Sequence, residues 1–135
     1  METIYVIMLR DAVTGFLEKE LCSITLSKHD EYIVNMYAAE GDDGMTLNLR
    51  LSTGRDVSDW EYDAVYDYYD PSALEAEGIK VSEQDDDYDP VWLATLPYDE
   101  DNVQAAVEKI LELHHNELVD VFDTIKDKRD EYTQD

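Results

Sequence analysis

The run from Met45 to Ser52 constrains the fold more than any other part of this sequence, because apolar and polar residues alternate strictly along it. The apolar positions are Met45, Leu47, Leu49 and Leu51, and the polar ones are Thr46, Asn48, Arg50 and Ser52. Successive side chains of a β-strand point to opposite faces of the sheet. This run therefore predicts a strand with one buried face and one face in water.

Three earlier segments predict further strands, separated by residues that favour turns. These strands are expected at Thr3–Leu9, Phe16–Leu26 and Glu31–Ala39, with turns at Asp11–Gly15, Ser27–Asp30 and Gly41–Gly44. Thr3–Leu9 is a continuous apolar run rich in β-branched residues, so we expect it to be covered on both faces. Four strands joined by short turns predict an N-terminal antiparallel β-meander.

The segment from Ser58 to Asp70 predicts a short helix with two contrasting faces. Ser58 and Glu61 have the spacing of a capping box, and Pro71 ends the helix because a proline pushes the preceding residue out of the α region. At 3.6 residues per turn, carboxylates gather on one face and apolar or aromatic side chains on the opposite face. The acidic face comprises Asp59, Asp63, Asp67 and Asp70, and the other comprises Tyr62, Val65 and Tyr69.

A much longer helix is predicted from Asp99 or Asp101 to about Tyr132, with a sustained apolar stripe along one side. Its stripe consists of Val103, Val107, Ile110, Leu111, His114, Leu118, Val121, Phe122 and Ile125. At about 1.5 Å per residue the helix would be roughly 45–50 Å long, more than a sheet of short strands covers. We therefore expect its end to project, to fray or to pair with another subunit, which makes a homodimer through this helix one arrangement.

Shorter elements fill the middle of the chain. A helical turn is expected at Ser72–Glu77, a short strand at Ile79–Val81, and a strand or ordered connection at Val91–Leu96. The overall prediction is an α+β fold, in which the antiparallel sheet carries the short helix and the long C-terminal helix on one face. A length of 135 residues fits a single domain over residues 1–135.

The charge of the chain excludes several classes of function. There are 34 acidic and 10 basic residues, for a net charge of −24, and residues 56–101 hold 16 acidic residues and one lysine. Direct nucleic-acid binding and attraction to anionic membranes both require basic surfaces, so neither is expected. A single cysteine excludes an internal disulfide, and no signal peptide or membrane span is recognisable at the N-terminus. We therefore expect a cytoplasmic protein whose partner is another, basic protein.

Three segments resemble a family of small acidic bacterial proteins of unknown function. They are the opening strand, the run Thr14–Leu21, and the run Arg55-Asp-Val-Ser-Asp-Trp-Glu-Tyr-Asp-Ala64 with its acidic helix. The similarity covers most of the chain. It implies an uncharacterised bacterial cytosolic protein, and it supplies no activity, ligand or catalytic residue.

Two sets of side chains are candidate binding residues. The acidic set is Asp59, Asp63, Asp67 and Asp70 on the helix, with Asp85, Asp86, Asp87 and Asp89 in the following loop. The aromatic anchors are Trp60, Tyr62, Tyr66 and Tyr69, residue types that are favoured in protein interfaces. The alternatives are a solvated acidic helix face, and a helix wedged between the sheet and the C-terminal helix. If the acidic loops and Asp99–Asp101 share one surface with the helix, the protein could instead mimic nucleic acid and inhibit a protein that binds it.

Signals for catalysis are weak. Glu112 and His115 form one E-x-x-H pair, whereas di-iron carboxylate bundles use two. His114 falls within the apolar stripe, which favours a core histidine with a hydrogen-bond partner, and Cys22 is expected to be a buried, inert thiol. The acidic loops lack the spacing of a helix–loop–helix calcium site, and phosphate-binding glycine loops and a nucleophile elbow are absent. We therefore expect a non-enzymatic interaction or regulatory module without a metal or cofactor, with a metal-dependent enzyme or cation-binding protein as a further alternative.

Overall fold

The alternating run becomes an interior strand, β4 (Gly44–Ser52), which lies between β3 (Ile33–Gly41) and β6 (Val91–Pro97). Its three central leucines, Leu47, Leu49 and Leu51, are at most 1% exposed. The computed structural model describes residues 2–11, 13–41, 44–84 and 89–133. Within these residues it confirms the half-buried strand that the alternation predicts.

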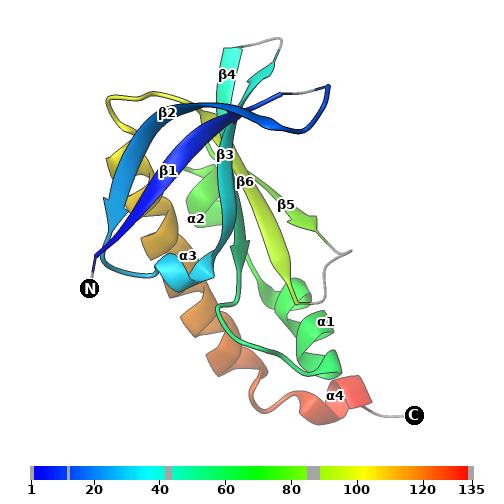
Figure 1. The fold of residues 1–135 in the computed structure, drawn as a ribbon. Helices are drawn as coiled ribbons and strands as arrows, with labels where there is room; N and C mark the ends of the chain where they lie inside the picture. Colours follow the sequence, from blue (N-terminus) through cyan, green and yellow to red (C-terminus); the bar gives the residue numbers. More distant parts are fainter. Residues whose placement is uncertain (1, 12, 42–43, 85–88, 134–135) are drawn as a thin grey trace.

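The sheet has six strands in the order β2-β1-β3-β4-β6-β5 (Figure 1), which confirms the α+β class. The remaining strands are β1 (Thr3–Arg10), β2 (Leu17–Leu26) and the edge strand β5 (Lys80–Gln84). The sheet is mixed rather than a simple meander, because β3 pairs in parallel with β1 at Leu9↔Ala38 and Arg10↔Ala39. A 3₁₀ turn, η1 (Asp30–Tyr32), follows β2, and the chain passes the start of β1 before β3 begins on its other side.

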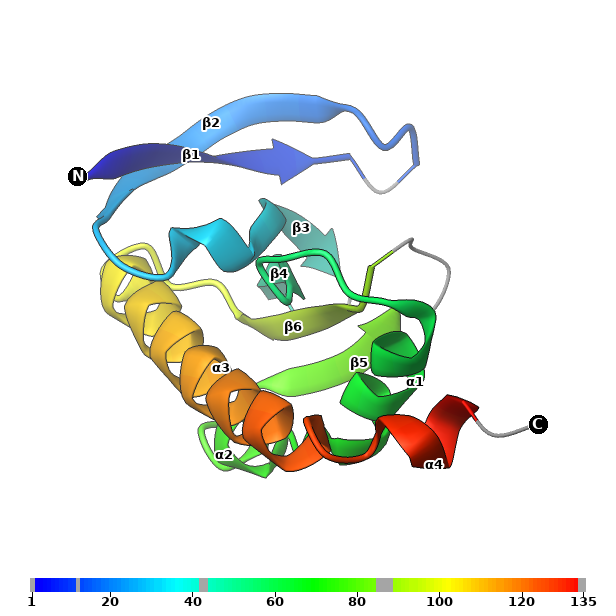
Figure 2. The ribbon, with the colours of Figure 1, turned by 90° about the horizontal axis from the view of Figure 1, so that it is seen from below.

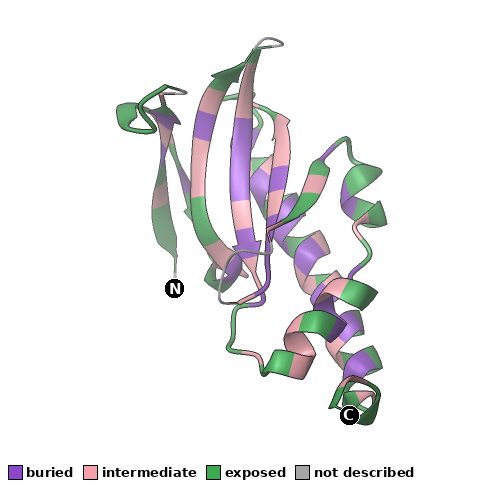
Figure 3. Cartoon of the chain, turned by 90° about the vertical axis from the view of Figure 1, so that its right-hand side faces the viewer, coloured by how far each residue is buried: buried purple, intermediate pink, exposed green. Residues whose placement is uncertain are grey.

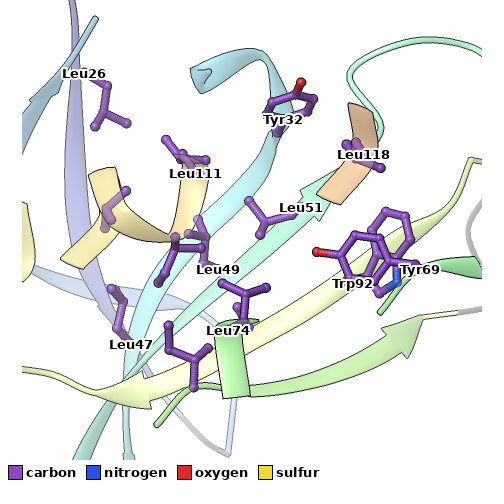
Figure 4. Close-up of a cluster of buried hydrophobic side chains, with 14 of the residues drawn as sticks. Leu26, Tyr32, Leu47, Leu49, Leu51, Tyr69, Leu74, Trp92, Leu111 and Leu118 are labelled. Carbon is purple, nitrogen blue, oxygen red and sulfur yellow. The ribbon is translucent and has the colours of Figure 1, made fainter. Parts of the chain in front are cut away.

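The helices gather on one side of the sheet (Figure 2), as the sequence predicts. They are α1 (Asp59–Tyr68), α2 (Ser72–Glu75), α3 (Val103–Ile125) and α4 (Arg129–Thr133). The buried stripe of α3 and the inward side chains of the strands share one hydrophobic core (Figure 4). Because eight residues of α3 are buried there, this helix is the main cover of the sheet.

The long C-terminal helix does not continue to Tyr132. α3 ends at Ile125, three residues intervene, and α4 then contacts α1. The ring of Tyr132 in α4 lies 6.3 Å from the ring of Trp60 in α1, tilted by 37°, and its hydroxyl donates to Asp67 at 2.7 Å. α4 therefore docks on α1 instead of projecting, because the aromatic side chains of α1 offer it a surface to cover.

The opening strand is buried on one face only, and the prediction of burial on both faces is wrong (Figure 3). Ile7 and Leu9 point into the core, whereas Ile4 and Val6 are 68% and 45% exposed. The helices cover only one side of the sheet, so the apolar side chains of β1 that point to the other side stay in solvent.

Candidate functional site

The acidic candidate site is built on α1, whose start is set by the predicted capping box. Oε1 of Glu61 accepts hydrogen bonds from the backbone N–H and the hydroxyl of Ser58, both at 2.9 Å. The helix ends at Tyr68, so Asp70 lies beyond it. The carboxylate of Asp70 accepts a hydrogen bond from the backbone N–H of Ser72, and the hydrogen bonds from Ser72 lower its pKa. Asp70 thus belongs to the turn before α2 and not to the acidic face of α1.

The acidic face of α1 therefore consists of Asp59, Asp63 and Asp67, and all three side chains are exposed. A spacing of four residues places neighbouring carboxylates about 6 Å apart along the helix. None of the ion pairs between described residues involves these three carboxylates, and Asp67 accepts its hydrogen bond from the neutral Tyr132. Within the described part of the chain, the face therefore presents a row of negative charge to solvent that no ion pair compensates.

The opposite surface of the molecule differs in charge. The pairing register puts Asn48 opposite Thr95 on the outer face of the sheet, where the two side chains are hydrogen-bonded at 3.2 Å. Among the described residues, the outward side chains of β3, β4, β5 and β6 include no carboxylate. By the pairing register they are Asn35, Tyr37, Ala39, Thr46, Asn48, Arg50, Ser52, Lys80, Ser82, Gln84, Val91, Leu93, Thr95 and Pro97. The negative charge is therefore concentrated away from the part of the outer sheet face that β3, β4, β5 and β6 form.

Among the described residues, the other predicted acidic side chains do not extend the acidic face of α1. Asp85, Asp86 and Asp87 lie outside the described residues. Asp89 is half-buried, and one of its carboxylate oxygens has no hydrogen-bond partner within the described structure. Asp99–Asp101 precede the start of α3, whereas α1 packs against its far half and α4, so these carboxylates do not adjoin α1 (Figure 1). A surface that joins them to α1, as nucleic-acid mimicry requires, is not found in this part of the chain.

Two of the predicted aromatic anchors are engaged inside the protein. The ring of Tyr69 is 8% exposed and stacks at 4.3 Å on Trp92 (Figure 4). The hydroxyl of Tyr66 donates to the carbonyl oxygens of Gln84 and Val91 and accepts from the Val91 N–H at 2.8 Å. Burial raises the pKa of both tyrosines. These two side chains join α1 to the sheet, so they match the alternative of a wedged helix.

The other two anchors, Trp60 and Tyr62, are half-buried and lie nearer the surface of α1. Trp60 contacts Tyr132, and Tyr62 meets Tyr66 edge-on with ring centroids 5.2 Å apart. Each therefore keeps part of its ring area in solvent beside the acidic row.

His114 is a core histidine with fixed hydrogen bonds, as its place in the stripe predicts. It is completely buried, and its Nε2 lies 2.8 Å from the carbonyl oxygen of Ser52. A carbonyl only accepts, so Nε2 carries the proton and Nδ1 accepts from the Tyr69 hydroxyl at 2.8 Å. Burial lowers the pKa of His114 to about 4, and the ring is neutral at physiological pH.

His115 belongs to a second cluster that the sequence does not reveal. Its ring stacks on His29 at 4.1 Å, and its Nδ1 lies 2.7 Å from the hydroxyl of the buried Tyr32. The described residues contain no group of three or more His, Cys, Asp or Glu side chains placed to hold a metal ion. The signal that could have indicated this cluster is His29 itself, which is the only other histidine in the chain.

The remaining candidate, Cys22, is half-buried rather than fully enclosed. The hydroxyl of Tyr98 donates a hydrogen bond to its Sγ at 3.2 Å.

None of the described helices is long and apolar enough to cross a lipid bilayer.

The fold and the site define a strongly acidic α+β protein that has an open sheet face and an acidic face on its helical layer. The chain belongs to a family of unknown function (DUF6762), whose model matches residues 1–133. The expected membership of a family without known activity is thereby confirmed. No curated protein and no solved structure matches the chain.

Proposed function

We propose that this protein is a non-enzymatic interaction module of the cytoplasm, and that it binds a basic protein through the acidic face of α1. The observation that supports the proposal is the row of Asp59, Asp63 and Asp67, exposed and without an ion pair among the described residues. Carboxylates at i,i+4 repel one another, which costs the free helix some stability. A partner with lysine or arginine side chains at the same pitch would relieve that repulsion.

The half-buried rings of Trp60 and Tyr62 supply the apolar part of the same contact. Surface ion pairs alone contribute little, with a median of about 0–1 kcal/mol each, so charge steers the partner more than it holds it. Aromatic side chains at the edge of the face would provide desolvated area that is insensitive to salt. In the proposed interface, charge therefore attracts the partner and the aromatic contacts keep it bound.

The homodimer expected through the C-terminal helix receives no such support. The exposed side of α3 carries Glu108, Glu112, Asp120 and Asp123, and two copies of this surface would repel each other. We therefore favour a different protein as the partner.

The proposal is tested by affinity capture with the tagged protein from the lysate of its source, eluted with a salt gradient. The double variant Asp59→Asn/Asp63→Asn should lose the captured basic partner. The matched control Glu18→Gln/Glu20→Gln removes the same charge from exposed positions on β2 and should retain it. Equal retention by both variants would show that net charge, and not the face of α1, attracts the partner.

A competition arm separates this proposal from nucleic-acid mimicry. Duplex DNA is added to the captured complex at constant salt. A basic interaction partner that does not bind DNA stays on the protein, whereas a nucleic-acid-binding enzyme is displaced. Displacement would favour the inhibitor alternative and would contradict an interface specific to proteins.

A further inference from the structure

A groove lies away from α1, between the connection that follows β2 and the middle of α3. Its volume is about 490 Å³. One wall is formed by residues 26–29 and the other by Glu108, Glu112 and Asn116. The three helix residues recur every four positions, so they lie in one row facing the connection.

The two walls carry opposite charge, because the ammonium of Lys28 on the connection lies opposite the carboxylates of Glu108 and Glu112 on α3. His29 lies beside Lys28 on the same wall. Among the described residues, no ion pair joins Lys28 to either glutamate, so the opposing charges are within one groove but do not neutralise each other. Such a groove offers separate positions for a cation and for an anion.

His29 is held firmly at the edge of this groove. Its backbone is left-handed, with φ 65° and ψ 11°, a conformation that non-glycine residues rarely adopt. Its ring stacks on His115 with an interplanar angle of 19°, and Tyr32 fixes His115 through a 2.7 Å hydrogen bond. Strained residues persist where their surroundings hold them, and they cluster at ligand sites. The imidazole is thus positioned before any ligand arrives.

We propose that this groove binds a free dibasic amino acid such as arginine or lysine. Glu108 and Glu112 are about 6 Å apart along the helix and each receives one cationic group of the ligand. Lys28 and a ring N–H of His29 receive the carboxylate, and Asn116 supplies an amide to the same groove. The carboxylates of Glu108 and Glu112 and the ammonium of Lys28 leave one negative charge, which matches the single positive charge of the ligand.

The ligand's carboxylate distinguishes this site from general attraction of cations. A protein with a net charge of −24 attracts any positive molecule, and the attraction grows with the charge of that molecule. Agmatine is arginine without the carboxylate and carries one more positive charge. Non-specific attraction therefore ranks agmatine above arginine, whereas the groove ranks arginine above agmatine.

Isothermal titration of the full chain at about 0.15 M salt tests this ranking. L-arginine is compared with agmatine and with L-citrulline, which keeps the α-amino acid but lacks the guanidinium charge. L-lysine and cadaverine form a parallel pair. We expect arginine or lysine to bind at least about tenfold more tightly than its truncated analogues. If neither amino acid binds at about 10 mM, or if agmatine binds as tightly as arginine, the proposal is wrong.

Variants assign the two ends of the ligand. Lys28→Gln should abolish the preference for arginine over agmatine, and Glu112→Gln the preference over citrulline. Both side chains are exposed, so the fold should be retained. Lys126→Gln and Glu77→Gln, exposed positions outside the groove, are matched controls that should change neither preference. Equal binding of Nα-acetyl-L-arginine would contradict a role for the α-ammonium group and therefore a free amino acid as the ligand.

Discussion

Lowering the pH should destabilise the protein through His114, well before its carboxylates titrate. The ring is buried, donates to Ser52 and accepts from Tyr69, and its pKa in the folded state is about 4 against an ordinary value of 6.5. The unfolded chain therefore binds a proton at a higher pH than the folded chain does. Stability is fully present above about pH 6.5 and declines as the pH falls towards 4.

The magnitude follows from the displacement of the pKa. Each unit corresponds to 1.36 kcal/mol, so a change from 6.5 to about 4 amounts to about 3 kcal/mol when the titration is complete. Between about pH 7.5 and pH 5.5 the same relation predicts a loss of about 1.3 kcal/mol. The group is almost completely buried, so solvent screening does not reduce this contribution.

Urea unfolding at about pH 7.5 and pH 5.5 measures the effect as a change in the free energy of unfolding. His114→Gln should remove the His114 contribution to the difference between the two pH values, whatever its own cost in stability. His115→Gln is the matched control, because it changes the neighbouring, half-buried histidine and should leave the contribution in place.

An NMR titration of the wild-type protein provides a second measurement that does not depend on the variant folding. The ring protons of His114 should keep the shifts of a neutral imidazole down to about pH 5. The reasoning is refuted if His114 titrates near 6.5 in the folded protein. It is also refuted if wild type and His114→Gln lose the same free energy over this pH range.

Three further perturbations test separate parts of the structure. Trp60→Ala and Tyr132→Ala in a double-mutant cycle should give a coupling energy of about 0.5–1.5 kcal/mol, because the two rings join α4 to α1; a coupling of zero would mean that α4 does not dock there. Gly78→Ala places a Cβ in open space at φ 82° and should lower the free energy of unfolding by about 1–2 kcal/mol. Gly54→Ala should lower it by at least about 1 kcal/mol more, because its Cβ would meet the Tyr32 ring at 3.0 Å. Equal losses in urea unfolding would contradict this contact. Added salt should raise the melting temperature, since it screens the repulsion among the 34 acidic side chains, and a melting temperature indifferent to salt would show that these charges are locally compensated.

Part of the candidate site was predictable because it depends on neighbours in the chain. The capping box and the acidic row of α1 follow from residue spacing, and both are found where that spacing places them. Spacing was not sufficient for Asp70, because it predicts Asp70 on the acidic face although the helix ends two residues before it. Ser72 provides the carboxylate of Asp70 with a local partner, and such competition between a helix and a turn is decided by a few hydrogen bonds.

The functional assignment of the aromatic residues depended on contacts that no local pattern contains. The sequence predicts Tyr69 and Tyr66 as surface anchors, yet in the structure they contact Trp92 and Val91 of β6. β6 itself follows α1 by more than twenty residues, and its place between β4 and β5 determines which rings of α1 meet the sheet. The division between anchor and core side chain is thus a property of the packed layers.

The sequence by itself determined the elements: alternation produced the half-buried β4, the apolar stripe produced α3, and capping residues located the start of α1. Only the tertiary structure decided that β3 adjoins β1, that α4 folds back onto α1, and that His29 meets His115 across 86 positions. The physical reason is that secondary structure is selected by hydrogen bonds and side-chain periodicity within a few residues. Long-range pairing is selected by which surfaces bury the most apolar area together, and that choice exists only once the whole chain is packed.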